Sequence, residues 1–301
     1  MSRFLATVAC LLLVPMAAAQ ERFADLDNSV RVEYQFIHTG LFESSIGPID
    51  IGETDTNVVL LSGVYSLGER WKIYGSLPYV QKRHTGNPFG VHDPVANFVN
   101  FTPPDLRNMD DGDYHGGLQD LYAGVQDLAT DSPFFSISPV ISFGVPVSDY
   151  PFYASAAIGK NLWAIPVGAS MNFTPYFSDW FFQADIAYVF SERVLGVDLN
   201  HWLAYVSASY YITPRFAPRI FLRARRAPNA LDFPEDFPDP DTENFWRHDQ
   251  TLKHEFINAG IGFDYILTDR YEISATYYQT VDPNQVSEVD YAGTVALTWS
   301  F

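Results

Sequence analysis

The chain has 301 residues, a formal net charge of −18 and an aromatic content of 16%. Nucleic-acid binding needs basic patches, so an acidic excess of this size argues against a nucleic-acid partner. The one cysteine, Cys10, lies close to the N-terminus, and this position excludes a disulfide-stapled secreted domain.

The chain begins with the features of a secretory signal peptide. Arg3 precedes an apolar run that starts at Phe4, and Ala17, Ala18 and Ala19 form a small-residue cleavage site. We expect residues 1–19 to be removed and residues 20–301 to form a single domain. Removal of Arg3 would leave 17 basic and 36 acidic residues, a net charge of −19 (17 − 36). No later stretch approaches the ~18 uninterrupted apolar residues of a transmembrane helix.

The remaining chain is dominated by segments in which apolar and polar residues alternate, which is the period of a β-strand. Most of these segments are close to the ~9–11 residues with which a tilted strand crosses a membrane. We identify twelve of them, at residues 30–37, 57–67, 71–80, 118–128, 134–145, 162–173, 180–190, 201–212, 216–225, 255–267, 271–281 and 289–301.

The connections between these segments alternate between short and long. The short ones are "GER", "ATDSP", "TPYFSD", "TPR" and "TDR", which are rich in turn-forming residues. The long ones are residues 39–56, 81–117, 146–161, 191–200, 226–254 and 282–288. A soluble sandwich has no reason to keep every long loop at one end, whereas a membrane barrel has tight periplasmic turns and longer outer loops. The sequence therefore predicts an all-β, antiparallel, up-and-down transmembrane barrel of about 12 strands.

The two longest loops, residues 81–117 and 226–254, are expected outside the cell. The first either folds inward as a lid or covers the outer mouth, and the sequence leaves both open. It carries Asp110, Asp111 and Asp113, and clustered carboxylates suit Ca²⁺. The spacing is not that of a known calcium loop, so we favour a solvated acidic loop and predict no metal or cofactor.

Charged residues within the strands predict the contents of the lumen. A charge on the lipid face near the bilayer centre costs about 2–4 kcal/mol, so such side chains should point inward. The turn "TDR" brings Asp264 and Glu272 onto neighbouring strands, with Arg219 at a similar height. Two roles fit this pattern: the charged side chains form a constriction that selects solutes, or they pair with one another and only fill the interior of a narrow barrel. The inward candidates are Arg219, Arg223, Arg225, Glu33, Asp185, Asp264, Glu272 and Asp290.

Aromatic residues recur where the short turns end. Membrane barrels place such rings at the lipid–water interface as a girdle. We expect a girdle at the periplasmic interface, and we expect the last strand to end at the same height. The predicted girdle consists of Trp71, Phe134, Trp180, Phe216, Tyr271 and Trp299.

The final residues "VALTWSF" place Val295, Leu297, Trp299 and Phe301 on one face of a strand. This pattern resembles the C-terminal signal of Gram-negative outer-membrane barrels, which end in Phe after alternating apolar residues. The resemblance implies recognition by the barrel-assembly machinery, an even number of strands, both termini in the periplasm and localisation in the bacterial outer membrane.

A weaker resemblance is carried by "WKIYGSLPYV", "GGLQDLYAGV" and "GVPVSDYPFYASAAIG". These stretches are similar to the putative phenol-degradation-pathway outer-membrane family, which is distantly like fatty-acid transporters. The chain departs from the expected pattern at Gln119-Asp120 and at Pro146-Val147-Ser148. The resemblance implies a channel for hydrophobic or aromatic compounds.

Three functions remain open on the sequence. We favour a channel or transporter for small solutes, with outer-membrane lipid and lipopolysaccharide as its surroundings. The alternatives are a lipid-acting enzyme and a non-conducting structural or adhesive barrel. Twelve-stranded lipases use a His and Ser pair on the outer wall. His38 has Ser44 and Ser45 nearby, but no orienting carboxylate stands at a persuasive spacing, so we predict no enzymatic activity.

Overall fold

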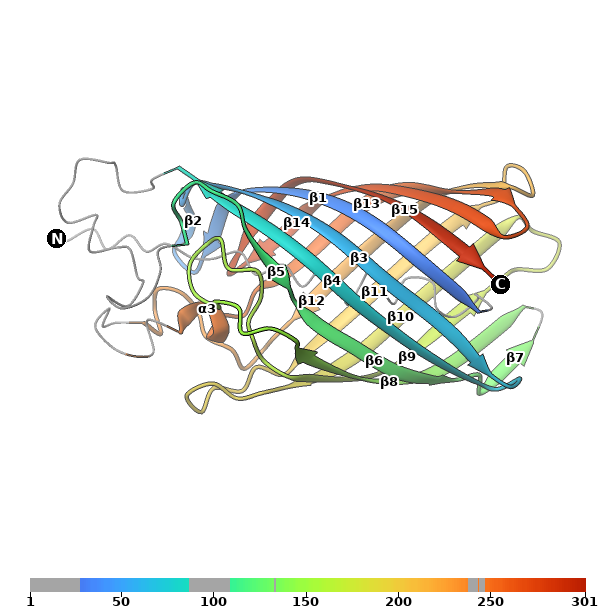
Figure 1. Ribbon diagram of the computed structural model, residues 1–301, viewed down its shortest axis with the longest axis horizontal. Helices are drawn as coiled ribbons and strands as arrows, with labels where there is room; N and C mark the ends of the chain where they lie inside the picture. Colours follow the sequence, from blue (N-terminus) through green and yellow to red (C-terminus); the bar gives the residue numbers. More distant parts are fainter. Residues whose placement is uncertain (1–27, 87–108, 133, 238–242, 244–246) are drawn as a thin grey trace.

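The computed structural model describes residues 28–86, 109–132, 134–237, 243 and 247–301, so the predicted signal peptide lies outside the described residues. Within them, twelve long strands form one closed antiparallel barrel in which each strand pairs with its neighbours along the chain and β15 pairs with β1 (Figure 1). The predicted fold class and strand number are confirmed. The twelve are β1 (Ser29–Ser44), β3 (Glu53–Leu67), β4 (Trp71–Thr85), β6 (Asp120–Asp127), β8 (Phe135–Pro146), β9 (Ala164–Phe173), β10 (Trp180–Ser191), β11 (His201–Tyr210), β12 (Phe216–Arg226), β13 (Glu255–Thr268), β14 (Tyr271–Asn284) and β15 (Val286–Ser300).

Four short elements complete the described part of the chain: β2 (Gly47–Ile49), β5 (His115–Leu118), β7 (Thr130–Ser132) and the helix α3 (His248–Thr251). Strands β5 and β6 replace the one strand predicted at residues 118–128, and β5 begins three residues earlier, within the predicted loop. Both pair with β4, and their registers differ by one residue across Gln119, so a bulge at this residue divides the strand. Among the described residues, no helix is long and apolar enough to cross a membrane.

Several expected loops are shorter than predicted because strand pairing continues beyond the apolar segments. Residues 282–288 were expected to form a loop, but β14 and β15 leave only Gln285 between them, with a φ of 56°. Likewise β1 extends to Ser44 and β3 starts at Glu53. Backbone pairing holds these ends together where apolar and polar residues do not alternate regularly, so alternation does not reveal them. The loop predicted at residues 81–117 accordingly spans residues 86–114, and much of it lies outside the described residues.

One face of every long strand is apolar and exposed. Ile220 and Ile261 each expose 61% of their surface, and Val295 exposes 56%. Soluble proteins rarely leave such wide apolar surfaces in water, whereas a barrel places this face against lipid. This surface and the closed topology identify a membrane barrel.

The opposite face is buried and encloses polar and apolar side chains together. Close packing there requires glycine at several inward positions, of which two are described here. A Cβ on Gly260 would lie 2.3 Å from Cζ of Phe221, and one on Gly144 would lie 2.2 Å from Cε1 of Tyr122. Each aromatic ring therefore occupies the space that a side chain on the neighbouring strand would fill.

Two connections on the side of the long loops close the mouth. Residues 147–163, here called the inner loop, enter the barrel, where Tyr150 and Ile158 are buried. Residues 227–254 are here called the covering loop, and its described residues 227–237 and 247–254 pack at the same end of the barrel as the β2 hairpin. Phe233, Phe237 and Leu252 of the covering loop form an apolar cluster with Phe42 and with the β2 hairpin. The lumen is thus narrowed by ordered loop segments as well as by wall side chains.

Candidate functional site: the lumen and its inner loop

The three predicted arginines stand in a column on the inward face of β12. Arg219, Arg223 and Arg225 are 4%, 7% and 2% exposed, whereas Ile220 and Leu222 between them point outward. The alternation follows from the strand period, and the direction follows from the cost of a guanidinium in lipid. The column runs from the half of the barrel nearer the short turns to the covering loop.

Aromatic rings surround Arg219 and Arg223, the two arginines farther from the covering loop. Arg219 donates to the hydroxyl of Tyr205 at 3.4 Å, and its guanidinium lies 5.8 Å from the ring centre of Phe221. The guanidinium of Arg223 lies 5.2 Å from the ring centres of both Phe221 and Tyr278. Cation–π contacts of this kind stabilise a positive charge away from water.

Arg225, the arginine nearest the covering loop, joins the column to that loop. Nη1 of Arg225 donates to the carbonyl of Lys253 and, at 2.9 Å, to that of His254. This guanidinium therefore anchors the last residues of the covering loop to the wall of the barrel.

The predicted acidic residues are distributed around the wall. Glu33 is buried and accepts from Arg31 of its own strand at 2.7 Å. Asp185 accepts from Gln183 at 2.7 Å. Asp264 lies opposite Ala217, which is one inward position from Arg219 toward the short turns. Glu272 lies opposite Ile266, which is one further inward position in the same direction. The register therefore brings Arg219, Asp264 and Glu272 to neighbouring heights.

Asp290 was expected to point inward and does not. The pairing of β1 with β15 skips this residue, because His38 faces Tyr291 and Thr39 faces Val289. The resulting bulge turns Asp290 outward beside Tyr291, where its carboxylate lies 3.8 Å from Nε2 of His38. A bulge breaks the period-two pattern on which the prediction depended.

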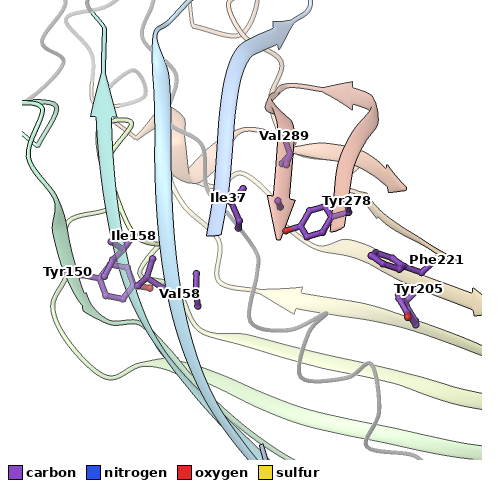
Figure 2. Packing of buried hydrophobic residues seen from close by; sticks show 10 residues of the cluster. Ile37, Val58, Tyr150, Ile158, Tyr205, Phe221, Tyr278 and Val289 are labelled. Carbon is purple, nitrogen blue, oxygen red and sulfur yellow. The ribbon is translucent and has the colours of Figure 1, made fainter. Parts of the chain in front are cut away.

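An apolar cluster occupies the lumen near the height of Phe221. Figure 2 shows Tyr205, Phe221 and Tyr278 on one side, and Val58, Tyr150 and Ile158 on the other. Tyr150 and Ile158 come from the inner loop, and the rest of the labelled residues come from the strands. The cluster therefore joins the inner loop to opposite parts of the barrel wall.

Polar contacts hold the inner loop in place. Nζ of Lys82 donates to the carbonyl of Ala157 at 3.2 Å, and Nε2 of Gln119 donates to that of Ile158 at 2.5 Å. The hydroxyl of Tyr150 donates to the carboxylate of Asp120. Sequence reasoning missed these residues. The run "YASAAIG" is a usable signal, because small apolar residues are unusual in a solvated loop.

The acidic run of the first long loop is partly engaged in the same assembly. The carboxylate of Asp110 accepts from the backbone N–H groups of Ser155 and Ala156 at 3.0 Å and 2.8 Å. Asp111 lies 2.8 Å from Nε2 of His115. In the described part of the chain, no group of three His, Cys, Asp or Glu residues is arranged to hold a metal ion.

The predicted aromatic residues lie where strands meet the short turns. Trp71, Trp180, Tyr271 and Trp299 are exposed, and Phe134 and Phe216 are half-buried. Tyr271 lies directly opposite Trp299, whose ring centre is 5.0 Å from that of Phe301. Val295 and Leu297 point outward along the same strand. These rings and apolar side chains stand at one end of the barrel, on its outer face.

The histidine considered for an enzymatic site lies on the outer wall. Nδ1 of His38 lies 2.8 Å from Asp55, and the ring stacks on Tyr291 with centres 4.9 Å apart. The hydroxyls of Ser44 and Ser45 donate elsewhere, to the carbonyls of Gly47 and Phe233. His38 thus has the orienting carboxylate that sequence reasoning did not find, and neither serine is directed at it.

No protein-family model matches the chain, and no curated protein matches it in sequence. In structure it is similar to the COG4313 outer membrane channel from Pseudomonas putida F1, with a TM-score of 0.66 at 12% identity over 92% of this chain and 96% of that one. It is also similar to the translocator domain of the autotransporter NalP from Neisseria meningitidis, with a TM-score of 0.53 at 12% identity over 94% of this chain and 92% of that one. Identities this low establish the fold alone, and the fold is that of a Gram-negative outer-membrane β-barrel.

Proposed function

We propose that the protein is an outer-membrane channel for small solutes and that the arginine column lines its path. The observation that carries this proposal is the column itself. Arg219, Arg223 and Arg225 are buried on one wall of the lumen, in a chain whose overall charge is strongly negative. A low-dielectric wall focuses the field of such a column, so a passing anion would be attracted. The fold is compatible with transport but does not by itself assign it.

The enzymatic alternative has less support. A His–carboxylate pair needs a nucleophile within hydrogen-bond reach of the histidine. His38 stacks on Tyr291, and the hydroxyls of Ser44 and Ser45 donate to backbone carbonyls instead. A non-conducting barrel would carry no current in planar bilayers, and this absence of current would distinguish it from a channel.

The proposal is tested by recordings in planar bilayers. The purified barrel should form reproducible open channels, and the reversal potential in a salt gradient should show a preference for anions. Arg223→Gln keeps much of the length and hydrogen bonding of the side chain and removes its charge. Anion preference should fall in this variant, and a barrel that is folded but silent would contradict the channel function.

Arg226→Gln is the matched control. Arg226 follows the column on the same strand but lies on its outer face, where it contacts Asp282 at 2.7 Å and Glu255 at 3.6 Å. Its replacement removes the same charge from the same strand and should leave the reversal potential unchanged. Equal shifts in the two variants would show that net charge, not the column, sets selectivity.

We propose the same orientation and partners as the sequence predicts. The long loops would face lipopolysaccharide outside, and the assembly machinery would recognise Val295, Leu297, Trp299 and Phe301. Single cysteines test the orientation. Glu235→Cys in the covering loop should react with a membrane-impermeant maleimide in intact cells. Asp269→Cys in a short turn should react only after the outer membrane is opened, and labelling of Asp269→Cys in intact cells would reverse the assignment.

A further inference from the structure

A cavity opens among the long loops, above the arginine column. Its volume is about 350 Å³, and we call it the vestibule. The inner loop, the covering loop and the connection between β10 and β11 all contribute to it. Its apolar lining consists of Phe152, Leu162, Val194 and Leu195.

The charged lining of the vestibule is close to neutral. Arg247 stacks on Phe152 at 5.2 Å and pairs with Glu243 at 3.1 Å. Arg193 lies 3.7 Å from Asp198. Glu192 also lines the cavity. The vestibule thus offers an apolar surface with polar edges, and its own charges give little preference between anions and cations.

Gln250, which lines the vestibule, is hydrogen-bonded to one of a group of basic side chains. Gln250 accepts from Arg247 at 3.0 Å and donates to the backbone carbonyl of Lys160 at 2.7 Å. Nζ of Lys160 donates to the carbonyls of Gln250 and Leu252, and Arg225 donates to those of Lys253 and His254. Lys160, Arg225 and His254 therefore all contact the backbone of the covering loop within residues 249–254. We call these three side chains, together with His201, the basic cluster.

The basic cluster has four basic groups and two acidic neighbours, Asp249 and Glu255. Arg225 and Lys160 are near enough for their charges to act on His201 and His254. The nearby acids have other partners. Asp249 lies 3.1 Å from His248, and Glu255 accepts from the N–H of Ala227 at 2.8 Å and from Asn284 at 2.9 Å. The charged and titratable groups that face the cluster are Tyr122, His248, Asp249 and Glu255.

Buried nitrogen atoms in the cluster lack partners in the described part of the chain. They are Nε of Arg225, Nε2 of His201 and Nδ1 of His254, on side chains that are 2%, 4% and 0% exposed. Burial and the nearby guanidinium of Arg225 hold the pKa of Lys160 well below its usual range. Burial and the charges of Lys160 and Arg225 lower the pKa of the His254 imidazole in the same way. Without an anion, the neutral forms of Lys160 and His254 are therefore favoured.

We propose, as an extension of the channel function inferred above, that the vestibule and the basic cluster form a capture site for a small organic carboxylate with an apolar or aromatic body. The body would pack against Phe152, Leu162 and the neighbouring apolar wall. The carboxylate would reach Lys160, whose chain neighbour Asn161 and hydrogen-bond partner Gln250 both line the vestibule. Arg225 and then Arg223, which lies between two aromatic rings, continue the path inward.

Proton uptake accompanies binding in this arrangement. A bound carboxylate favours the charged forms of Lys160, His201 and His254, so their protonation rises when the site is filled. Binding that takes up protons becomes tighter as pH falls. The affinity for a carboxylate that stays ionised should therefore increase from alkaline toward neutral pH.

Titration calorimetry on the full barrel in detergent micelles tests the site without requiring conduction. Benzoate should bind at least about tenfold more tightly than benzamide, which has the same ring and no charge. Repetition in buffers of different ionisation enthalpy should show net proton uptake. Equal binding of benzoate and benzamide, or no binding of benzoate, would overturn the proposal. A silent channel that still binds benzoate would refute the proposed function and leave the capture site standing.

Variants locate the binding. Lys160→Met keeps the length of the side chain and should weaken benzoate binding at least about tenfold. Lys72→Met removes the same charge from the inward face of β4, far from the vestibule, and should leave binding unchanged. Heat-modifiable migration in gels verifies that each variant is folded. Equal affinities of Lys160→Met and the wild type for benzoate would place the site elsewhere. If Lys160→Met does not fold, the comparison of benzoate with benzamide on the wild-type protein decides whether the capture site exists.

Discussion

The attachment of the inner loop to the barrel wall can be weakened by two substitutions. Lys82→Met and Gln119→Leu remove the donors to the carbonyls of Ala157 and Ile158 while keeping side chains of similar size. A hydrogen bond from a charged group contributes about 1.5–3 kcal/mol, and one between neutral groups contributes about 0.5–1.5 kcal/mol. The pair together contributes roughly 2–4.5 kcal/mol.

This loss has a predictable effect on the lumen. Each ~1.4 kcal/mol changes an equilibrium tenfold, so the population with the inner loop displaced should rise roughly 30-fold to 2,000-fold. Single-channel recordings of the double variant should show frequent openings of higher conductance. Amide hydrogen exchange in the inner loop should accelerate to a similar extent, because exchange reports the population of the open form.

Lys72→Met again provides the control. Lys72 is buried on the inward face of the same strand as Lys82 but lies at the end of the strand next to the short turn. Its replacement should leave both the conductance and the exchange of the inner loop unchanged. If the double variant exchanges its inner-loop amides at the wild-type rate, the two hydrogen bonds do not hold the loop and the reasoning is refuted.

Two further predictions concern the wall. Gly260→Ala should lower the free energy of unfolding by about 1–3 kcal/mol in a urea titration, because the new Cβ would overlap Phe221; Gly293→Ala, with no atom within 4 Å of the new Cβ, should change it by far less. Ile261→Lys on the lipid face should cost about 2–4 kcal/mol in the same measurement in lipid vesicles, whereas Ile261→Gln should cost clearly less. Equal losses within either pair would contradict the assigned packing or the assigned face.

The sequence predicts the direction of most wall side chains because a regular strand has only two faces and lipid excludes charge from one of them. Arg219, Arg223 and Glu33 follow this rule and are buried inside. Asp290 does not follow it, because a bulge places two successive residues on the outer face. A bulge depends on pairing with a distant strand, so the residues next to it in sequence do not reveal it.

The content of the lumen was harder to predict than its wall. Tyr150, Ile158 and Lys160 belong to a connection that has no period, and they reach the lumen only because Lys82, Gln119 and Asp120 hold the inner loop there. Such contacts join residues far apart in the sequence. The aromatic cluster and the basic cluster depend on them and could not be inferred from the strands alone.

The sequence by itself determined the class of fold, the number of strands, the lipid-facing surface and the side of the wall on which the arginines lie. Each of these follows from a local rule, namely the period of a strand, the turn-forming residues and the cost of a charge in lipid. The tertiary structure decided which loops enter the barrel, where the vestibule opens and which basic side chains meet beneath it. These features depend on contacts between Arg225, Lys160 and the covering loop, which only the closed barrel brings together.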